Sequence, residues 1–149
     1  MNCKVLLLVV LLVFVRGIHA LDDSMDDLYL LRYYQAPVAE LLWEIAVFTR
    51  DGTPYIQGRD YFGTTFKRDM DRNDFRTFEN RISALNLDRF SSEQPEHMGE
   101  SFYRLYYVKN GIRKGFVCND SRPATGSDLQ LHVAIRIIKN YARLYIPDR

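Results

Sequence analysis

The chain has 149 residues and a nearly balanced charge, with 20 Lys and Arg against 19 Asp and Glu. This balance excludes the clustered basic excess that marks a nucleic-acid-binding surface, and the length is that of one domain able to bury an apolar core without disulfides or metal ions. Ten Tyr and nine Phe supply much of the apolar surface for that core.

The N-terminal segment has the three parts of a secretory signal peptide. Lys4 is followed by the apolar run Val5–Val15 and then by Ala20, a small residue of the type that signal peptidase requires. Arg16 ends the run well short of the roughly 20 apolar residues that a spanning helix needs, so cleavage is favoured over a membrane anchor. We therefore predict a signal peptide over residues 1–20, secretion (to the periplasm in a bacterium), and no stable membrane insertion after cleavage.

The rest of the chain divides into a linker and one domain. Residues 21–27 include four Asp and are expected to be a solvated acidic linker, and residues 28–149 are expected to form a single domain. Cys3 would leave with the signal peptide. Cys118 would then be the one remaining cysteine, and a single thiol cannot form an internal disulfide.

Apolar and alternating patterns indicate the first strands. Leu28–Tyr34 is rich in aliphatic and aromatic residues and predicts a strand that Pro37 interrupts. A second strand alternates up to Asp51-Gly52, the dipeptide of a two-residue hairpin turn. Counting back from this turn pairs Thr49 with Pro54, at a non-hydrogen-bonded position where the missing proline N–H costs the ladder nothing.

A second hairpin is predicted around Asn110-Gly111, the strongest dipeptide pattern for a type I′ turn. Its register places Tyr103 opposite Cys118. One face of these two strands is assigned to the core because it is apolar, and its residues are Tyr103, Leu105, Tyr107, Phe116 and Cys118.

Two helices are predicted from apolar stripes at helical spacing. The first covers Arg72–Leu85, with Asp71 as its N-cap and Asn86 as a left-handed stop. The second starts at Ser127, the first residue of a capping box, and runs to Pro147. The stripes are Phe75, Phe78, Ile82 and Leu85 in the first helix, and Leu131, Ile135, Ile138, Ala142 and Tyr145 in the second, widened by Val133, Ile137 and Leu144.

The order strand, hairpin, helix, hairpin, helix predicts an α+β fold. A single antiparallel sheet with two helices packed on one face satisfies all the apolar stripes at once. The opposite face is expected to be mixed and solvated. Tyr and Arg are enriched at interface hot spots, so this face is the candidate binding surface if the two hairpins are neighbours in the sheet. Its candidate residues are Phe48, Tyr55, Arg59, Arg104, Tyr106 and Arg113. In the alternative interpretation, the aromatic residues only stabilise cross-strand pairs.

A strand containing Trp43–Phe48 leads into the turn Asp51-Gly52, then Tyr55 and Gly58, a helix, a Tyr-rich strand and a terminal helix. This arrangement resembles small exported bacterial domains of unknown function. The resemblance covers most of the mature chain. It implies an α+β fold and no particular activity.

A catalytic alternative depends on one thiol and one imidazole. Cys118 and His132 would act as nucleophile and base in a small secreted hydrolase or thiol enzyme. Cys118 falls on the predicted core face, however, where a free cysteine is usually inert. The acidic and histidine residues of 91–100 lack the spacing of a helical zinc site, so no metal site and no cofactor are expected.

The favoured interpretation is a non-catalytic extracellular binding module for a protein or small ligand whose identity the sequence does not specify. Asn119, in Asn119-Asp120-Ser121, is an acceptor for an N-linked glycan in a eukaryotic host. Two routes to a dimer are open, one through Cys118 and one through an unpaired sheet edge.

Overall fold

The computed structural model describes residues 26–90, 100–120 and 127–145. The expected signal peptide, residues 21–25 of the linker, most of the 91–100 loop, Ser121 of the glycan acceptor and Pro147 lie outside the described residues, as does the capping side chain of Ser127. Within the described ranges the chain forms one six-stranded antiparallel sheet and two helices. The predicted α+β class with a single antiparallel sheet is confirmed at this level.

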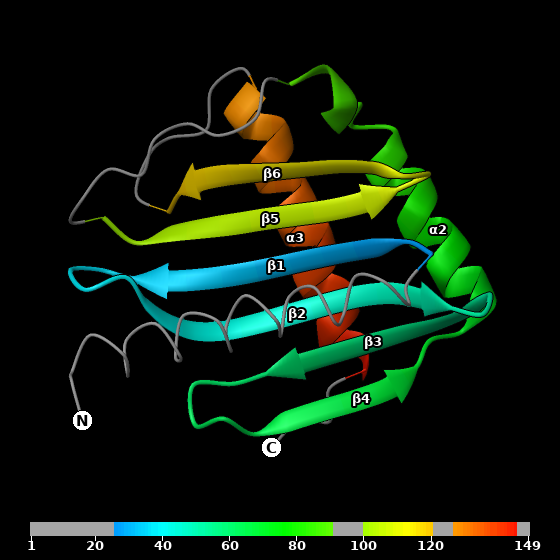
Figure 1. The fold of residues 1–149 in the computed structure, drawn as a ribbon, viewed down its shortest axis with the longest axis horizontal. Helices are drawn as coiled ribbons and strands as arrows, with labels where there is room; N and C mark the ends of the chain where they lie inside the picture. The colour runs from blue at the N-terminus through cyan, green and yellow to red at the C-terminus, as the bar shows by residue number, and fades with distance from the viewer. Residues whose placement is uncertain (1–25, 91–99, 121–126, 146–149) are drawn as a thin grey trace, which may run out of the picture.

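The sheet places the first strand at its centre. The strands lie in the order β4-β3-β2-β1-β5-β6, and each is antiparallel to its neighbours (Figure 1). The two predicted hairpins, β2-β3 and β5-β6, are therefore not neighbours, because β1 lies between them. The strands are β1 (Leu28–Gln35), β2 (Glu40–Arg50), β3 (Thr53–Arg59), β4 (Thr65–Asp69), β5 (Phe102–Lys109) and β6 (Ile112–Asn119).

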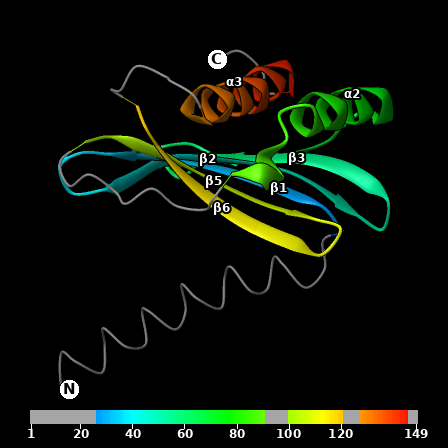
Figure 2. The same ribbon diagram turned by 90° about the horizontal axis from the view of Figure 1, so that it is seen from above.

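The helices leave one end of the sheet open. α2 (Arg72–Ser83) is followed by the short 3₁₀ helix η1 (Leu87–Arg89), and α3 (Ser127–Tyr145) ends the described chain. Figure 2 shows α2 and α3 on the same side of the sheet, and Figure 1 shows α2 across the end with the hairpin turns and α3 across the middle. The part of the sheet where β1 ends and β5 begins therefore lies beyond α3, on the side away from α2.

Both predicted turns and registers are confirmed. Residues 51, 52, 110 and 111 all have positive φ, between 51° and 77°, as a type I′ turn requires of its central residues. Thr49 lies opposite Pro54, and Tyr103 lies opposite Cys118. Because the turn residues set the register locally, these pairs follow from the sequence without any knowledge of the sheet order.

β4 was not among the predicted elements. Its residues Thr65–Asp69 are exposed except for the half-buried Phe66, so the strand lacks an apolar alternation. It pairs with β3 at the sheet edge, where the Phe66 ring covers Gly58 so closely that an added Cβ would overlap it. A short charged edge strand of this kind also limits pairing with another sheet.

The start of α2 is capped as predicted. The Asp71 carboxylate accepts hydrogen bonds from the backbone N–H groups of Asn73 (2.8 Å) and Asp74 (3.2 Å), which satisfies two of the donors that a helix leaves unpaired at its N-terminus. The helix ends at Ser83, two residues before the predicted end. Asn86 has the predicted left-handed conformation, with φ of 51°.

One apolar core fills the space between the helices and the sheet. Phe78 of α2 is fully buried, and its ring meets Tyr29 edge-on at a centroid distance of 5.0 Å and Tyr141 of α3 at 5.4 Å. The predicted core face of the second hairpin belongs to this core. Its five residues, Tyr103, Leu105, Tyr107, Phe116 and Cys118, are all buried.

The stripe predicted along α3 is confirmed except at one edge. Ile138 is completely buried, whereas Leu144 is 71% exposed. Leu144 follows Ile138 by six residues, which is about 240° around the helix axis and turns its side chain away from the core. Including Leu144 in the buried stripe was therefore wrong.

Candidate functional site

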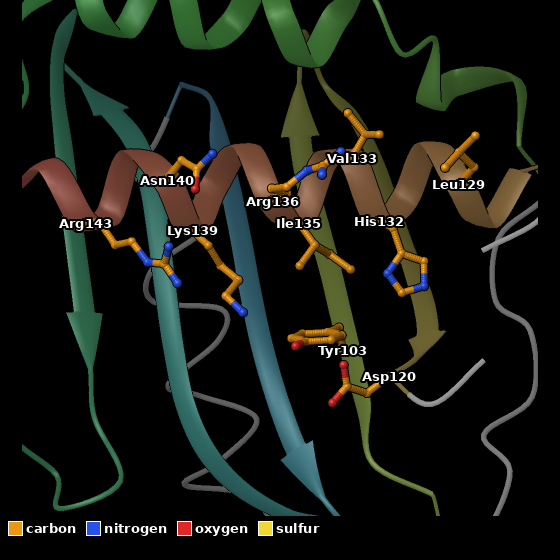
Figure 3. Close-up of a pocket in the computed structure, with 10 residues that line it drawn as sticks. All are labelled: Tyr103, Asp120, Leu129, His132, Val133, Ile135, Arg136, Lys139, Asn140 and Arg143. Atoms are coloured by element: carbon orange, nitrogen blue, oxygen red, sulfur yellow. The ribbon is translucent and has the colours of Figure 1, made fainter. Parts of the chain in front are cut away.

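A cavity of about 580 Å³ lies beside α3, at the part of the sheet that α2 does not reach. Figure 3 shows His132, Lys139 and Arg143 extending from α3 towards the side on which Tyr103 and Asp120 lie. We call this cavity the α3 groove. Its lining residues are Tyr103, Asp120, Leu129, His132, Val133, Ile135, Arg136, Lys139, Asn140 and Arg143.

A row of basic side chains forms one wall of the α3 groove. His132, Arg136, Lys139 and Arg143 follow one another at intervals of four, three and four residues, which places them on a single stripe of the helix. The row extends over about 16 Å at the rise of an α-helix. Arg136 and Arg143 are exposed, and no salt bridge within the described ranges pairs either of them with a carboxylate.

Three aromatic rings lie under this row. Tyr33 stacks on Trp43 at a centroid distance of 5.5 Å and packs on Tyr103 at 4.8 Å. The Lys139 ammonium lies 5.6 Å from the centroids of both the Trp43 and the Tyr103 rings, within cation–π range. The rings therefore help to hold the half-buried Lys139 ammonium in the wall of the groove.

Asp120 supplies a carboxylate across from the basic row. The Tyr33 hydroxyl donates a hydrogen bond of 3.0 Å to its Oδ2 atom. Burial raises the pKa of Tyr103 above its ordinary value, and the nearby negative charge of Asp120 raises it further. Both effects keep the phenol protonated, so Tyr103 is a neutral polar group at neutral pH.

Buried tyrosines predict a loss of stability in alkali. Burial raises the pKa of Tyr29 and of Tyr107, and the carboxylates of Glu79 and Asp88 respectively add to these shifts. In the unfolded chain a tyrosine titrates at about pH 10. Above that pH the unfolded state loses protons that the folded state retains, so this stability is complete below about pH 10 and declines above it.

We expect the melting temperature to fall steeply above about pH 10. The ultraviolet absorbance of tyrosinate, measured on the same samples, is expected to show fewer than ten ionised tyrosines while the protein is folded. Ionisation of all ten in the folded protein, at the pH of free tyrosine, would contradict the burial described above.

The predicted catalytic pair is divided between the core and the groove. Cys118 has 6% of its surface exposed and lies in the apolar core, whereas half-buried His132 lines the α3 groove. A reactive thiolate normally occupies a partly exposed, electropositive site. The burial of Cys118 instead suits a structural thiol.

A thiol reagent is therefore expected to modify Cys118 on the order of 100-fold more slowly in the folded protein than in denaturant, because access requires local opening. The denatured protein serves as the internal reference for reagent quality. Rapid modification of the folded protein at neutral pH would instead favour the thiol-enzyme alternative.

The candidate residues on the opposite sheet face do not form one compact patch. Arg59 lies on β3 and Arg113 on β6, four strand spacings or about 19 Å apart. The expectation of a solvated face is wrong for Phe48, which is 1% exposed and clusters with Leu28 and Val108. Tyr55 stacks on the Phe48 ring at 5.5 Å.

Two of these candidates do meet at a smaller cavity. Arg104 and Tyr106 line a space of about 280 Å³ on this face, together with Arg32. Arg104 also lies over the Tyr34 ring at 5.5 Å, and Arg32 forms a salt bridge of 3.0 Å with Glu44.

The predicted glycan acceptor, Asn119, is half-buried and is the last residue of β6.

Arg136, Lys139 and Arg143 were not among the binding residues predicted from the sequence. Their spacing, with His132, was the available indication of a shared stripe. The spacing does not show that this stripe faces a cavity shared with Tyr103 and Asp120, because β5 and the end of β6 meet α3 only in the tertiary structure.

Metal binding and membrane crossing find no support in the part of the chain that the structure describes. No three His, Cys, Asp or Glu side chains among these residues gather closely enough to hold a metal ion. No described helix combines the length and the apolar character needed to cross a bilayer. The α3 groove is lined by basic, aromatic, carboxylate, amide and apolar side chains.

Comparison with protein-family models, with curated proteins and with solved structures finds no match for this chain. A function for the α3 groove thus depends on the geometry and charge of its own residues.

Proposed function

We propose that this protein is an exported binding module without catalytic activity, and that it holds an anionic ligand in the α3 groove. The observation that carries the proposal is the row His132, Arg136, Lys139 and Arg143 along one wall of a cavity of about 580 Å³. Export, expected from residues 1–20, is part of the proposal.

The charge of the groove supports an anionic ligand. Arg136 and Arg143 present planar guanidinium groups that bind carboxylate, sulfate or phosphate oxygens through paired hydrogen bonds. Hydrogen bonds to charged groups contribute about 1.5–3 kcal/mol each, less where water and salt reach them. Several such contacts in one groove are enough for specific binding.

The placement of the helices supports a groove at this location. The proposal takes α2 and α3 as packed on the same sheet face, with α2 across the end that carries the hairpin turns and α3 across the middle (Figure 1). Beyond α3 no further helix among the described residues covers this face, and the core-type side chains Tyr33, Trp43 and Tyr103 lie there beside Lys139 of α3. Concave sites lined by aromatic and a few polar groups are typical ligand sites.

The proposal is non-catalytic because the described groove lacks an activated nucleophile. Cys118 is buried in the core. The hydrolase or thiol-enzyme alternative requires it to reach His132 and a substrate, and its burial argues against that access.

Binding of tripolyphosphate, a compact polyanion, tests the proposal. We expect calorimetry at low salt to show binding that the double variant Arg136→Gln/Arg143→Gln weakens at least about tenfold, because two charge-assisted contacts are lost. The matched control, Arg76→Gln/Arg81→Gln, removes two exposed arginines from α2 and is expected to leave the affinity unchanged. Equal loss in both variants would show a general charge effect and contradict a specific groove.

The export part of the proposal is tested separately from ligand binding. Mass spectrometry of the protein recovered outside the cell is expected to show a chain that begins after Ala20. Recovery of the chain with Met1 in the membrane fraction would contradict this part of the proposal.

A further inference from the structure

We infer that the ligand of the α3 groove is an acidic oligosaccharide, whose acidic groups contact the basic row of α3 and whose hydroxyl groups donate hydrogen bonds to Asp120. This inference rests on the proposed anion-binding function and adds the chemical class of the ligand. It is carried by three features of the groove: its length, its carboxylate and the packing of its aromatic rings.

The length of the basic row indicates an extended ligand. From His132 to Arg143 the row covers about 16 Å, and both of its arginines are exposed. A single phosphate or sulfate contacts one or two neighbouring side chains. A ligand that uses the whole row must carry several acidic groups separated along a chain.

Asp120 indicates that the ligand also carries hydrogen-bond donors. A carboxylate facing the basic row repels a ligand that offers only negative groups. An ionised carboxylate accepts about four hydrogen bonds. Tyr33 donates one to Oδ2, and the Tyr103 phenol also interacts with this carboxylate, so about two acceptor positions remain for a ligand. The hydroxyl groups of a sugar are donors that stand between its acidic groups, so an acidic oligosaccharide satisfies Asp120 and the cations together.

The aromatic rings disfavour a nucleotide. A base binds by stacking on an open aromatic face. Tyr33, Trp43 and Tyr103 instead pack on one another, with centroid distances of 4.8, 5.5 and 6.0 Å. Lys139 covers the Trp43 and Tyr103 rings. The groove therefore offers a ligand charges and polar groups more than a stacking surface.

Trp43 provides a direct measurement of binding in this groove. It is the one tryptophan of the chain, and its ring lies 5.6 Å from the Lys139 ammonium. An acidic group that draws Lys139 away from the ring changes the surroundings of the indole. Binding in the groove is therefore expected to change the intrinsic tryptophan fluorescence.

The experiment titrates the purified protein with four probes and follows the Trp43 fluorescence. The probes are a sulfated, uronate-containing hexasaccharide, its desulfated and carboxyl-reduced neutral counterpart, a polyglutamate peptide of equal charge, and tripolyphosphate. We expect the acidic hexasaccharide to bind at least about tenfold more tightly than the peptide or tripolyphosphate, and the neutral hexasaccharide to give no change.

A variant at Asp120 is expected to change the affinities for the two kinds of anion in opposite directions. Asp120→Ala is expected to weaken binding of the acidic hexasaccharide about fivefold to tenfold, because it removes the carboxylate that accepts a hydrogen bond from a sugar hydroxyl. The same variant is expected to strengthen binding of tripolyphosphate, because a repelling charge is removed. Asp69→Ala, on exposed β4, removes an exposed carboxylate away from the groove and is the matched control.

The outcomes separate this inference from the proposed function. If tripolyphosphate or the peptide binds as tightly as the acidic hexasaccharide, or if Asp120→Ala strengthens binding of every anion, the saccharide inference is overturned and the anion-binding function stands. If no anion binds, both are overturned. If the neutral hexasaccharide binds as well as the acidic one, the proposed contacts between acidic groups of the ligand and the basic row are wrong.

Discussion

Replacing Phe78 by alanine is expected to lower the free energy of unfolding by about 3–5 kcal/mol. Phe78 has no exposed surface, and its ring contacts the rings of Tyr29 and Tyr141, which connects α2 to the central strand and to α3. The variant loses this burial, and the rigid surroundings leave a cavity. Urea denaturation followed by circular dichroism measures the change as a lower midpoint at an unchanged slope.

Phe62→Ala is the matched control for this experiment. Phe62 is 84% exposed in the connection between β3 and β4, so its removal is expected to change the free energy of unfolding by less than about 0.5 kcal/mol. A similar loss from both variants would mean that the core does not lie where α2 meets the sheet. Because whole domains are stable by only about 5–15 kcal/mol, Phe78→Ala should remove a large share of the total.

Replacing Ile138 by alanine is expected to cost about 2–5 kcal/mol. Ile138 is fully buried where α3 crosses the sheet, in the same core as Leu31 and Phe116. Its loss creates a cavity under the helix that carries the basic row. Thermal unfolding by calorimetry, compared with the unchanged protein, measures the effect.

Leu144→Ala on the same helix is the matched control for Ile138→Ala, because the two residues lie on different faces of α3. Leu144 is 71% exposed, and the substitution is expected to have an effect below about 0.5 kcal/mol. If Leu144→Ala destabilised the protein as much as Ile138→Ala, the register of α3 would be wrong. The basic row, which follows from the same register, would then face another direction.

These substitutions also bear on the groove, because α3 has two functions in the fold. One stripe of the helix, with Ile138, closes the core, and the neighbouring stripe, with Lys139, forms a wall of the α3 groove. A helix held by its buried stripe presents its adjacent side chains in fixed positions. Such preorganisation lowers the entropy that a ligand must lose on binding.

Residues close together in the chain are sufficient to define the local structure of this protein. Asp51-Gly52 and Asn110-Gly111 specify their turns, and the turns specify the register of each hairpin, because adjacent residues decide both. Asp71 likewise marks the start of α2 through hydrogen bonds to residues two and three positions away. These interactions are local, so a pattern in the chain predicts them.

Which elements are neighbours depends on the packing of the whole domain. It places β1 between the hairpins, adds the edge strand β4, buries Phe48 and exposes Leu144. It also brings Asp120, the residue after β6, to the same cavity as Lys139 of α3, which forms the groove. These features depend on contacts between residues far apart in the chain, and the packing of a sheet against two helices selects them in ways that no local pattern records.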